Sequence, residues 1–554
     1  MTANHPQNTT YIPSNHLQGY LIGYCTDIEG NLEYWNHYKE ISRVLEDTDD
    51  GVRLKRNCYF IYGGDVCDRG PGDLRVLQDI LKLKKDNPDH VHIILGNRDI
   101  NKIRLLTELQ PEFTCKEARA FWIGDIDDKG DLNAVNRLKA ILEQTMGAPQ
   151  AFEFRRQELN EMGRGDSDSD VVQSFMETLK PDGLMTEYIV HGALALILGD
   201  CLFLHGGVHS NSYGWVPPFA SASADDTGHR VEDVAEWCAH LEVFRSREVS
   251  DFVEYSKSIH SAAPGEAAEV YSRCNWSSEG GYHHCTPGSR LLQYGMGWMP
   301  DNSVNPTLVY DNFLSDGAPQ PPPTDVIENL TKSGVRKLVT GHQPHGDAPV
   351  VIDSGGLQVI TGDTSYARNV RWFGPDATSE QRAHVDNLLR QVNGGAGLED
   401  IVHSNSSNTR GAAVSEICIK FDDVFPFASR TFIHGMLNNG LKYDFELPAS
   451  SKNRLIGKVT KDGWWVKGRM TTEGLRSASM TVGKRSTRLL NPIWNCIFCC
   501  CSTPHSQVSS ETSECKDTNA QTGDDDVYLV CLSSGRDVYN SLVESGELRE
   551  NIID

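Results

Sequence analysis

The chain has 554 residues, and its 76 acidic residues outnumber its 52 basic residues, which gives a formal net charge of −24. At roughly 150 residues per domain, this length allows about two to four domains. The acidic balance argues against a protein that binds nucleic acid or an anionic membrane over a broad surface, because phosphate groups are bound by clustered Lys and Arg. It does not exclude a phosphorylated substrate, since a bound metal ion reverses the local charge.

The first residues of the sequence contain no basic segment followed by an apolar one, so we expect no signal peptide. No run of 18 apolar residues occurs, so we expect no transmembrane segment. Most cysteines, among them Cys25, Cys58, Cys201 and Cys418, lie inside hydrophobic segments. This pattern is typical of buried, reduced thiols and favours a cytoplasmic protein.

Short apolar runs rich in Ile, Val, Tyr and Phe recur along the chain and predict buried strands. The runs are residues 20–24, 58–64, 91–96, 201–207, 337–342 and 357–363. Helical apolar stripes follow two of them, formed by Leu74, Leu77, Ile80 and Leu81, and by Val231, Val234, Ala235, Cys238 and Leu241. The alternation of strands and helices predicts an α/β protein built on a layered sheet.

Changes in composition divide the chain into five predicted regions. They are a flexible N-terminus at 1–18, a catalytic unit at 19–375 with insertions near 100–190 and 210–330, a Gly-, Asn- and Ser-rich linker at 376–410, a small β-rich accessory region at 411–490, and a Cys-containing acidic tail at 491–554. We expect the insertions to be largely helical lids or ordinary peripheral helices.

Polar side chains follow the predicted strands at the points where the strands end. They are Asp27 and Glu29 after the first run, Asp65, Asp68 and Arg69 after the second, Asn97, Arg98 and Asp99 after the third, His205 in the fourth and His342 in the fifth. In α/β sheets the ligand site lies beyond the carboxyl ends of the strands, so we expect these groups to share one crevice. Any one of these groups alone is more often a helix cap or a structural histidine, whereas the ordered series is far more specific.

This set of residue types suits two metal ions. Asp65 can bridge them, with Asp27 and Glu29 completing one site and a second set completing the other. The second set is Asn97, His205 and His342. Two ions roughly 3.5–4 Å apart can clamp a phosphoryl group and activate a water.

The same ordered motifs resemble those of the calcineurin-like metallophosphoesterases. The matching stretches are Asp27-x-Glu29, GDVCDRG at 64–70, GNRD at 96–99, HGG at 205–207 and GH at 341–342. The motif style is closest to the protein serine/threonine phosphatase branch, and the resemblance covers about residues 19–370 with the insertions unmatched. It implies a β-sandwich of mixed sheets flanked by helices, with a binuclear metal centre at the strand ends.

The resemblance also implies a reaction and a role for each residue. A water or hydroxide held between the two ions would attack the phosphoester directly, without a phosphoenzyme. Asp27 and Glu29 would hold the first ion, Asp65 would bridge, and Asn97, His205 and His342 would hold the second. Arg69 matches the arginine that binds substrate phosphate, and Asp68 matches the aspartate that pairs with the proton donor.

Two positions depart from the family pattern, which usually has histidine at both. Glu29 would make the first site harder and favour Mn²⁺ or Mg²⁺, with Fe or Zn²⁺ as the other candidate ions. Arg98 cannot donate a proton near neutral pH, because its pKa exceeds ~12. Arg98 could therefore be a second phosphate clamp, His209 or His345 could supply the proton, or the enzyme could be weak.

Two further segments carry predictions. The resemblance places a loop that closes one side of the site at 359–367, where Asp363 and Tyr366 would contact substrate; the alternative is a turn followed by a packed tyrosine. The cysteines at 496 and 499–501 could be acylated and associate with a membrane, could bind a metal, or could be incidental. The acidic stretch at 516–554 would disfavour an anionic membrane nearby.

The sequence therefore predicts a metal-dependent phosphoesterase that hydrolyses phosphomonoesters. A phosphoserine or phosphothreonine protein is the first substrate considered, and a small-molecule phosphoester or dinucleoside polyphosphate is the second. The alternative from another class is a degenerate member that binds phosphate or a phosphoprotein without turnover. A third possible function, a scaffold built on the C-terminal region, rests only on the length of chain outside the catalytic unit.

Overall fold

The computed structural model describes most of the chain up to residue 364 and shorter stretches beyond it. The described residues are 8–110, 133–219, 227–262, 287–299, 303–315, 318–364, 370–371, 413–423, 428–437, 442–447, 455–461, 463–470, 527–534 and 537–544, with single residues at 379, 383, 387, 411, 548 and 551. The cysteine cluster, Tyr366, nearly all of the predicted linker and most of the tail lie outside them.

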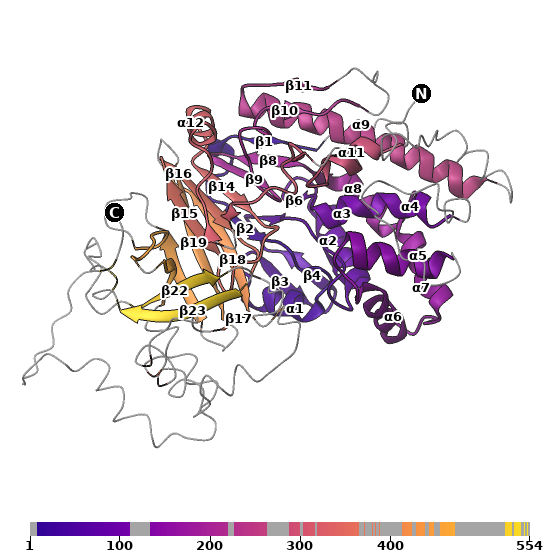
Figure 1. Ribbon diagram of the computed structural model, residues 1–554, viewed down its shortest axis with the longest axis horizontal. Helices are drawn as coiled ribbons and strands as arrows, with labels where there is room; N and C mark the ends of the chain where they lie inside the picture. The colour runs from indigo at the N-terminus through magenta and orange to yellow at the C-terminus, as the bar shows by residue number, and fades with distance from the viewer. Residues whose placement is uncertain are drawn as a thin grey trace, which may run out of the picture.

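Two mixed sheets form the centre of the molecule (Figure 1). The seven-stranded sheet runs in the order β20 (Lys442–Leu447), β19 (Ser429–Met436), β18 (Val414–Phe421), β2 (Leu21–Cys25), β5 (Cys58–Tyr62), β6 (Val91–Ile94) and β7 (Gly192–Ala193). The six-stranded sheet runs in the order β1 (Tyr11–Ile12), β8 (Ala195–Leu198), β9 (Cys201–Leu204), β14 (Lys337–Thr340), β16 (Leu357–Thr361) and β15 (Val350–Ser354). The predicted fold class, a mixed α/β protein with sheets flanked by helices, is confirmed.

Alternate residues of each strand face different layers, as the period of two in a strand requires. In β5, Tyr59 and Ile61 join the core between the two sheets, whereas Phe60 and Tyr62 join the core beneath the helices. Phe203 of β9 likewise faces the other sheet. Because both faces of these strands are buried, their sequences are continuous apolar runs rather than alternating ones.

Helices cover the outer face of each sheet. The helices α1 (Leu32–Ile41) and α2 (Asp73–Asp86) pack beside the seven-stranded sheet, and α9 (Val234–Ser261) and α12 (Thr324–Lys332) beside the six-stranded one. The predicted stripe of α2 is buried throughout. The stripe predicted from Val231 starts one turn too early, because Asp233 caps α9 by accepting bonds from the amides of residues 235 and 236.

A group of shorter helices lies at one side of the molecule, toward the right in Figure 1. They are α3 (Asn97–Asn101), η2 (Lys102–Arg104), α4 (Leu105–Glu108), α5 (Ala134–Ala140), η5 (Ile141–Thr145), α6 (Ala151–Glu161), α7 (Asp168–Thr178), α8 (Leu184–His191) and α11 (Ser289–Tyr294), and η1 (Ser14–His16) lies near the start of the chain. Most of them fall in the segment predicted as a helical insertion. Three small hairpins lie elsewhere in the described part of the chain. They are β3 (Leu45–Thr48) with β4 (Gly51–Leu54), beside α1 and α2; β10 (Trp215–Val216) with β11 (His229–Arg230), beside α9; and β12 (Leu314–Ser315) with β13 (Ala318–Pro319).

The predicted accessory region does not stand apart from the catalytic unit. Its first strand, β18, pairs antiparallel with β2 in the middle of the seven-stranded sheet, with Ile419 opposite Ile22. A four-stranded sheet follows, ordered β17 (Val370–Arg371), β23 (Asp537–Glu544), β22 (Val527–Ser534) and β21 (Trp465–Met470). Ile417, Ile419 and Phe421 of β18 belong to the core between the sheets, so this strand is an integral part of the fold.

Two smaller expectations can also be compared with the structure. The cysteines at 25, 58, 67, 201, 238, 418 and 531 are buried free thiols, which confirms the expectation for Cys25, Cys58, Cys201 and Cys418. Within the described residues, no helix is both long enough and apolar enough to cross a membrane.

Candidate metal centre

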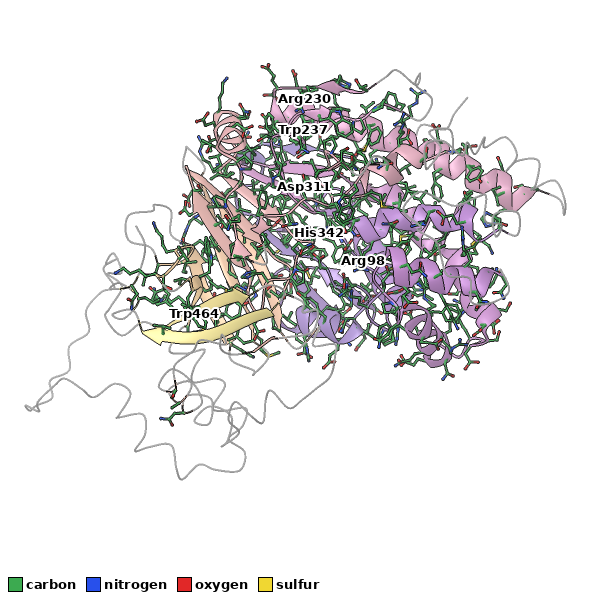
Figure 2. The ribbon with its side chains drawn as sticks, in the orientation of Figure 1. Arg98, Arg230, Trp237, Asp311, His342 and Trp464 are labelled. Atoms are coloured by element: carbon green, nitrogen blue, oxygen red, sulfur yellow. The ribbon has the colours of Figure 1, made fainter. Side chains whose placement is uncertain are left out.

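The predicted site residues come together where strands of both sheets end. Asp27 and Glu29 follow β2, Asp65 follows β5, His205 follows β9, and His342 follows β14. Their ligand atoms form two overlapping groups, one of Asp27, Glu29 and Asp65 and one of Asp65, His205 and His342, each with all ligand atoms within 4.8 Å of one another. Arg98 and His342 are labelled near the centre of Figure 2.

The backbone at this site adopts a conformation that side chains rarely accept. Among the described residues, six that are not glycine have a positive φ, and five of them belong to the predicted site. The five are Asp27 (54°), Glu29 (48°), Asp65 (53°), Asp68 (102°) and His342 (72°). Such conformations cost on the order of 1–3 kcal/mol each and cluster at functional sites, where the surrounding structure holds them in place.

Backbone bonds hold these turns against one another. The amide of Asp27 donates to the carbonyl of Gly64 at 3.0 Å, and the amide of Glu29 donates to the carbonyl of Asp65 at 3.0 Å. Across the two sheets, the amide of His342 donates to Asp27 Oδ2 at 3.0 Å. The ligands are therefore positioned by bonds between the turns.

Glycine is required at two of these turns because the chains approach closely. A Cβ on Gly96 would lie 2.2 Å from Asp65 Oδ1, and one on Gly341 would lie 2.2 Å from Asp27 Oδ2. Atoms cannot approach that closely, so any side chain at either position would displace a carboxylate.

Asn97, His205 and His342 converge on one point. Asn97 Oδ1 lies 3.2 Å from His205 Nε2 and 3.0 Å from His342 Nδ1. His205 Nδ1 lies 2.8 Å from the carbonyl of Gly63, which can only accept, so Nδ1 carries the proton and Nε2 presents its lone pair in the neutral ring. His342 Nε2 is buried and has no hydrogen-bond partner. This donor set of oxygen and neutral imidazole fits a divalent cation.

The pKa shifts at the site also fit a bound divalent cation. Burial, followed by the charge of His205, lowers the pKa of His342 to about 3, so its ring is neutral and able to act as a ligand. Burial would lower the pKa of His205 as well, but the neighbouring carboxylates Asp65 and Asp27 raise it to about 10. Burial also raises the pKa of Asp27 well above its usual range, with Asp363 as the next cause. A dense group of buried carboxylates attracts positive charge.

Arg98, Asp68 and Lys102 form a buried ionic group beside these ligands. Arg98 Nε lies 2.7 Å from Glu29 Oε1, and Arg98 Nη1 lies 3.7 Å from Asp68 Oδ2. Lys102 Nζ donates to Asp68 Oδ2 at 2.7 Å. Arg69 lies further out, with its side chain 29% exposed and its Nε 3.3 Å from Glu29 Oε2.

Asp99, which follows Arg98 in the sequence, shapes the centre together with Thr26, Lys102 and Tyr310, which the sequence analysis did not single out. Asp99 accepts bonds from the amides of Asp65, Val66 and Gly96 at 2.8–3.0 Å. Thr26 Oγ1 donates to Asp27 Oδ2 at 2.6 Å. Lys102 lies four residues after Arg98, a spacing that places both on one helical face and could have revealed it. Tyr310, whose ring lies 4.9 Å from that of His342, comes from the second insertion and had no local signal.

The alternative proton donors are engaged elsewhere. His209 Nε2 lies 3.0 Å from the carbonyl of Asn312, and its ring stacks on Phe313. His345 is buried, and its Nδ1 lies 3.8 Å from Cys531 Sγ. Asp363 is buried near Asp27, and Tyr366 lies outside the described residues.

No protein-family model matches this chain, and no curated protein matches its sequence. A cold-active protein-tyrosine phosphatase of a psychrophilic Shewanella species is similar in structure at 11% identity, with a TM-score of 0.36, over 79% of this chain and 82% of that one. A protein serine/threonine phosphatase from Saccharomyces cerevisiae, described as similar to human phosphatase PP5, is similar at 12% identity, with a TM-score of 0.25, over 64% of this chain and 71% of that one. Similarity at this level does not identify reacting groups, so function is inferred from the geometry of the site.

Proposed function

We propose that this protein is a metal-dependent phosphoesterase that hydrolyses phosphomonoesters. The observation that carries the proposal is the convergence of Asn97 Oδ1 with two imidazole rings beside the Asp65 carboxylate. The buried, unpartnered His342 Nε2 fits this reading, because a buried nitrogen without a hydrogen-bond partner costs free energy unless a ligand satisfies it.

Asp65, Asn97, His205 and His342 would hold a divalent ion, with Mn²⁺ as the first candidate and Mg²⁺, Fe or Zn²⁺ as the others. A divalent ion bound there would lower the pKa of a coordinated water and polarise a phosphoryl oxygen. The resemblance implies a second ion among Asp27, Glu29 and Asp65, and a metal count on the purified protein measures whether it binds.

Arg69 is the residue we propose for binding the substrate phosphate. Its guanidinium lies at the outer side of Glu29 and is 29% exposed, so it can meet an incoming phosphate while staying next to the ligand group. A planar guanidinium forms paired bonds to phosphate oxygens, which would orient the phosphorus for attack. Asp68 would act indirectly, by positioning Arg98 and Lys102.

The leaving group would receive little help from a proton donor. Arg98 and Lys102 stand beside Asp68, and the pKa of each is raised, because the neighbouring carboxylates outweigh the effect of burial. Groups that hold their protons this firmly are poor general acids near neutral pH. We therefore propose a preference for good leaving groups, such as aryl phosphates or phosphoanhydrides, over alkyl phosphates.

The proposed physiological substrate rests on the resemblance alone and not on the site. A phosphoserine or phosphothreonine protein is the first candidate in a cytoplasmic setting, and a small phosphoester or dinucleoside polyphosphate is the second. A protein that binds phosphate without turnover is the competing function, which the Glu29–Arg98 pair favours because it removes a usual ligand and a usual proton donor.

Hydrolysis of an aryl phosphate by metal-stripped protein tests the proposal. We expect no turnover without metal, turnover after Mn²⁺ is added, and loss of that turnover in Asp65→Asn. The matched control is Asp50→Asn, which changes an exposed aspartate in the turn between β3 and β4 and should leave the rate unchanged. Equal rates in Asp65→Asn and wild type, or no response to any metal, would exclude the enzyme. Phosphate binding without turnover would support the competing function.

A further inference from the structure

The guanidinium of Arg98 lies inside the carboxylate group that would hold the first metal ion. Its Nε is 2.7 Å from Glu29 Oε1 and 3.5 Å from Asp65 Oδ2. The side chain is only 10% exposed. A permanent positive charge is therefore already present among the oxygens of Glu29 and Asp65.

The two oxygens of Asp65 face different groups. Oδ1 lies 3.5 Å from His205 Nε2, on the side of the two imidazole rings. Oδ2 lies 3.5 Å from the guanidinium, on the side of Glu29. A carboxylate that bridges two ions would present one oxygen to each, and here one of the two positions is occupied by Arg98.

Both oxygens of Glu29 are paired with arginine as well. Arg98 approaches Oε1, and Arg69 Nε lies 3.3 Å from Oε2. A divalent ion requires direct contact with such an oxygen at about 2.0–2.2 Å. An ion this close would lie beside the guanidinium, and repulsion between two cations is strong in a buried site.

Arg98 is also held in place from its other side. Its Nη1 donates to the carbonyl of Met146 at 2.7 Å, and its own carbonyl accepts a bond from Lys102 Nζ at 3.2 Å. Its amide donates to Asp65 Oδ1 at 2.9 Å. These bonds fix the backbone and the guanidinium, so displacement by an ion would break several of them together.

The two departures from the family pattern are thus partners in one ion pair. An acidic residue at 29 and a basic residue at 98 add opposite charges, so their joint presence leaves the net charge of the centre unchanged. We propose that the centre binds one divalent ion, at Asp65, Asn97, His205 and His342, and that the guanidinium of Arg98 replaces the second ion beside Asp27, Glu29 and Asp65. This inference rests on the proposed function, because it assumes that the first ion binds.

Counting the ions in the wild-type chain tests the inference directly. Metal-stripped protein is titrated with Mn²⁺ by calorimetry, and bound metal is measured by elemental analysis after desalting. We expect one Mn²⁺ per chain, with the electron paramagnetic resonance hyperfine pattern of an isolated ion. Two ions per chain with metal-dependent hydrolysis would overturn this inference and leave the proposed function intact. No bound ion would overturn both.

Removing the Arg98 guanidinium tests whether this group is what excludes the second ion. We expect Arg98→Gln to bind two Mn²⁺ per chain, with the resonance pattern of a coupled pair, because the positive charge between Glu29 and Asp65 would then be gone. The matched control is Arg69→Gln, which also takes an arginine from Glu29 but leaves Arg98 in place, and it should bind one. A folded Arg98→Gln protein that still binds one ion, or a second ion in Arg69→Gln, would overturn the assignment to Arg98. Circular dichroism establishes folding, and the wild-type count stands if the variant does not fold.

Discussion

Glu416, Cys418 and His434 form a second buried group whose ligand atoms lie as close together as those of Asp65, His205 and His342. In this second group the Glu416 carboxylate accepts hydrogen bonds from two hydroxyl groups and a backbone amide. Glu416 accepts bonds from Tyr38 Oη at 2.7 Å, from Ser42 Oγ at 2.6 Å and from the amide of Arg43 at 2.6 Å. His434 Nε2 lies 3.2 Å from the same carboxylate.

The two groups therefore differ in what satisfies them. Glu416 lies within a regular strand and joins β18 to α1 through hydroxyl and amide donors. The centre at the strand ends has left-handed backbone at five residues, whereas Glu416, Cys418 and His434 have none. Each group contains a buried imidazole nitrogen with no hydrogen-bond partner, His342 Nε2 in one and His434 Nδ1 in the other. The left-handed backbone is what separates the candidate metal centre from the group around Glu416, because such conformations cluster at functional sites.

The largest effect expected from this comparison is on hydrolysis. His342→Asn should lower kcat/KM by roughly 10³-fold or more, beyond the ~10–100-fold that loss of an outer-shell partner costs, because a metal ligand is removed. His434→Asn, the matched buried histidine of the structural group, should hydrolyse within about twofold of wild type per folded molecule. Steady-state assays with excess Mn²⁺ measure both, and similar losses in the two variants would erase the distinction.

The next largest expected effect is a loss of folding stability that leaves Mn²⁺ affinity unchanged. Glu416→Ala should lower the free energy of unfolding by about 3–5 kcal/mol, because it leaves Tyr38, Ser42 and His434 without their shared acceptor. Urea denaturation gives the value, and Mn²⁺ affinity should stay unchanged. A weakened Mn²⁺ affinity with unchanged stability would instead make Glu416 part of a metal site.

The two groups should also respond oppositely to pH in the metal-free protein. The folded pKa of His205, about 10, exceeds its ordinary 6.5, so its contribution is fully present below pH 6.5 and is lost as pH rises toward 10. The pKa of Glu416 is lowered from 4.5, because its donors, led by His434, outweigh the effect of burial; its contribution is present above pH 4.5 and is lost in acid.

Unfolding free energies measured across pH test both signs, the alkaline loss assigned to His205 and the acid loss assigned to Glu416. His205→Asn should remove the alkaline dependence and keep the acid one, and Glu416→Gln should do the reverse. An alkaline dependence that survives in His205→Asn would show that another group causes it.

The smallest effect concerns single hydroxyl donors. Thr26→Val removes the donor to Asp27 Oδ2, and Ser42→Ala removes one to Glu416. A hydrogen bond to a charged group contributes about 1.5–3 kcal/mol. We expect Thr26→Val to change Mn²⁺ affinity or turnover, and Ser42→Ala to change only stability, as calorimetry and urea denaturation can show. The reverse assignment would contradict the comparison.

Much of this centre could be predicted from the sequence because its residues follow buried strands. The six apolar runs all contain strands, and Asp27, Asp65, Asn97, His205 and His342 do converge. Their chemical roles stay predictions. Local patterns were sufficient here because a strand end, a glycine and a polar residue occur within a few positions of one another.

The remaining features depend on contacts between distant segments. The pairing of Glu29 with Arg98 joins two turns whose order in space follows from sheet topology, and the carbonyl of Met146 comes from a helical insertion. Within the predicted β-rich accessory region, the described residues 455–459 contain only an isolated bridge, between Val459 and Trp465. The position of β18 beside β2 likewise has no local signal, because register between strands is set by the complete core.

Because β18 pairs with β2, the seven-stranded sheet cannot be completed until β18 has been synthesised. About 390 residues separate these two strands, so at roughly 5–20 residues per second a ribosome needs on the order of tens of seconds to make the second after the first. Until then one edge of β2 has no neighbour, and an unpaired edge is a site of wrong association. The turn that carries Asp27 and Glu29 extends directly from that strand. The candidate metal centre is thus expected to mature late, only after residue 421 has been made.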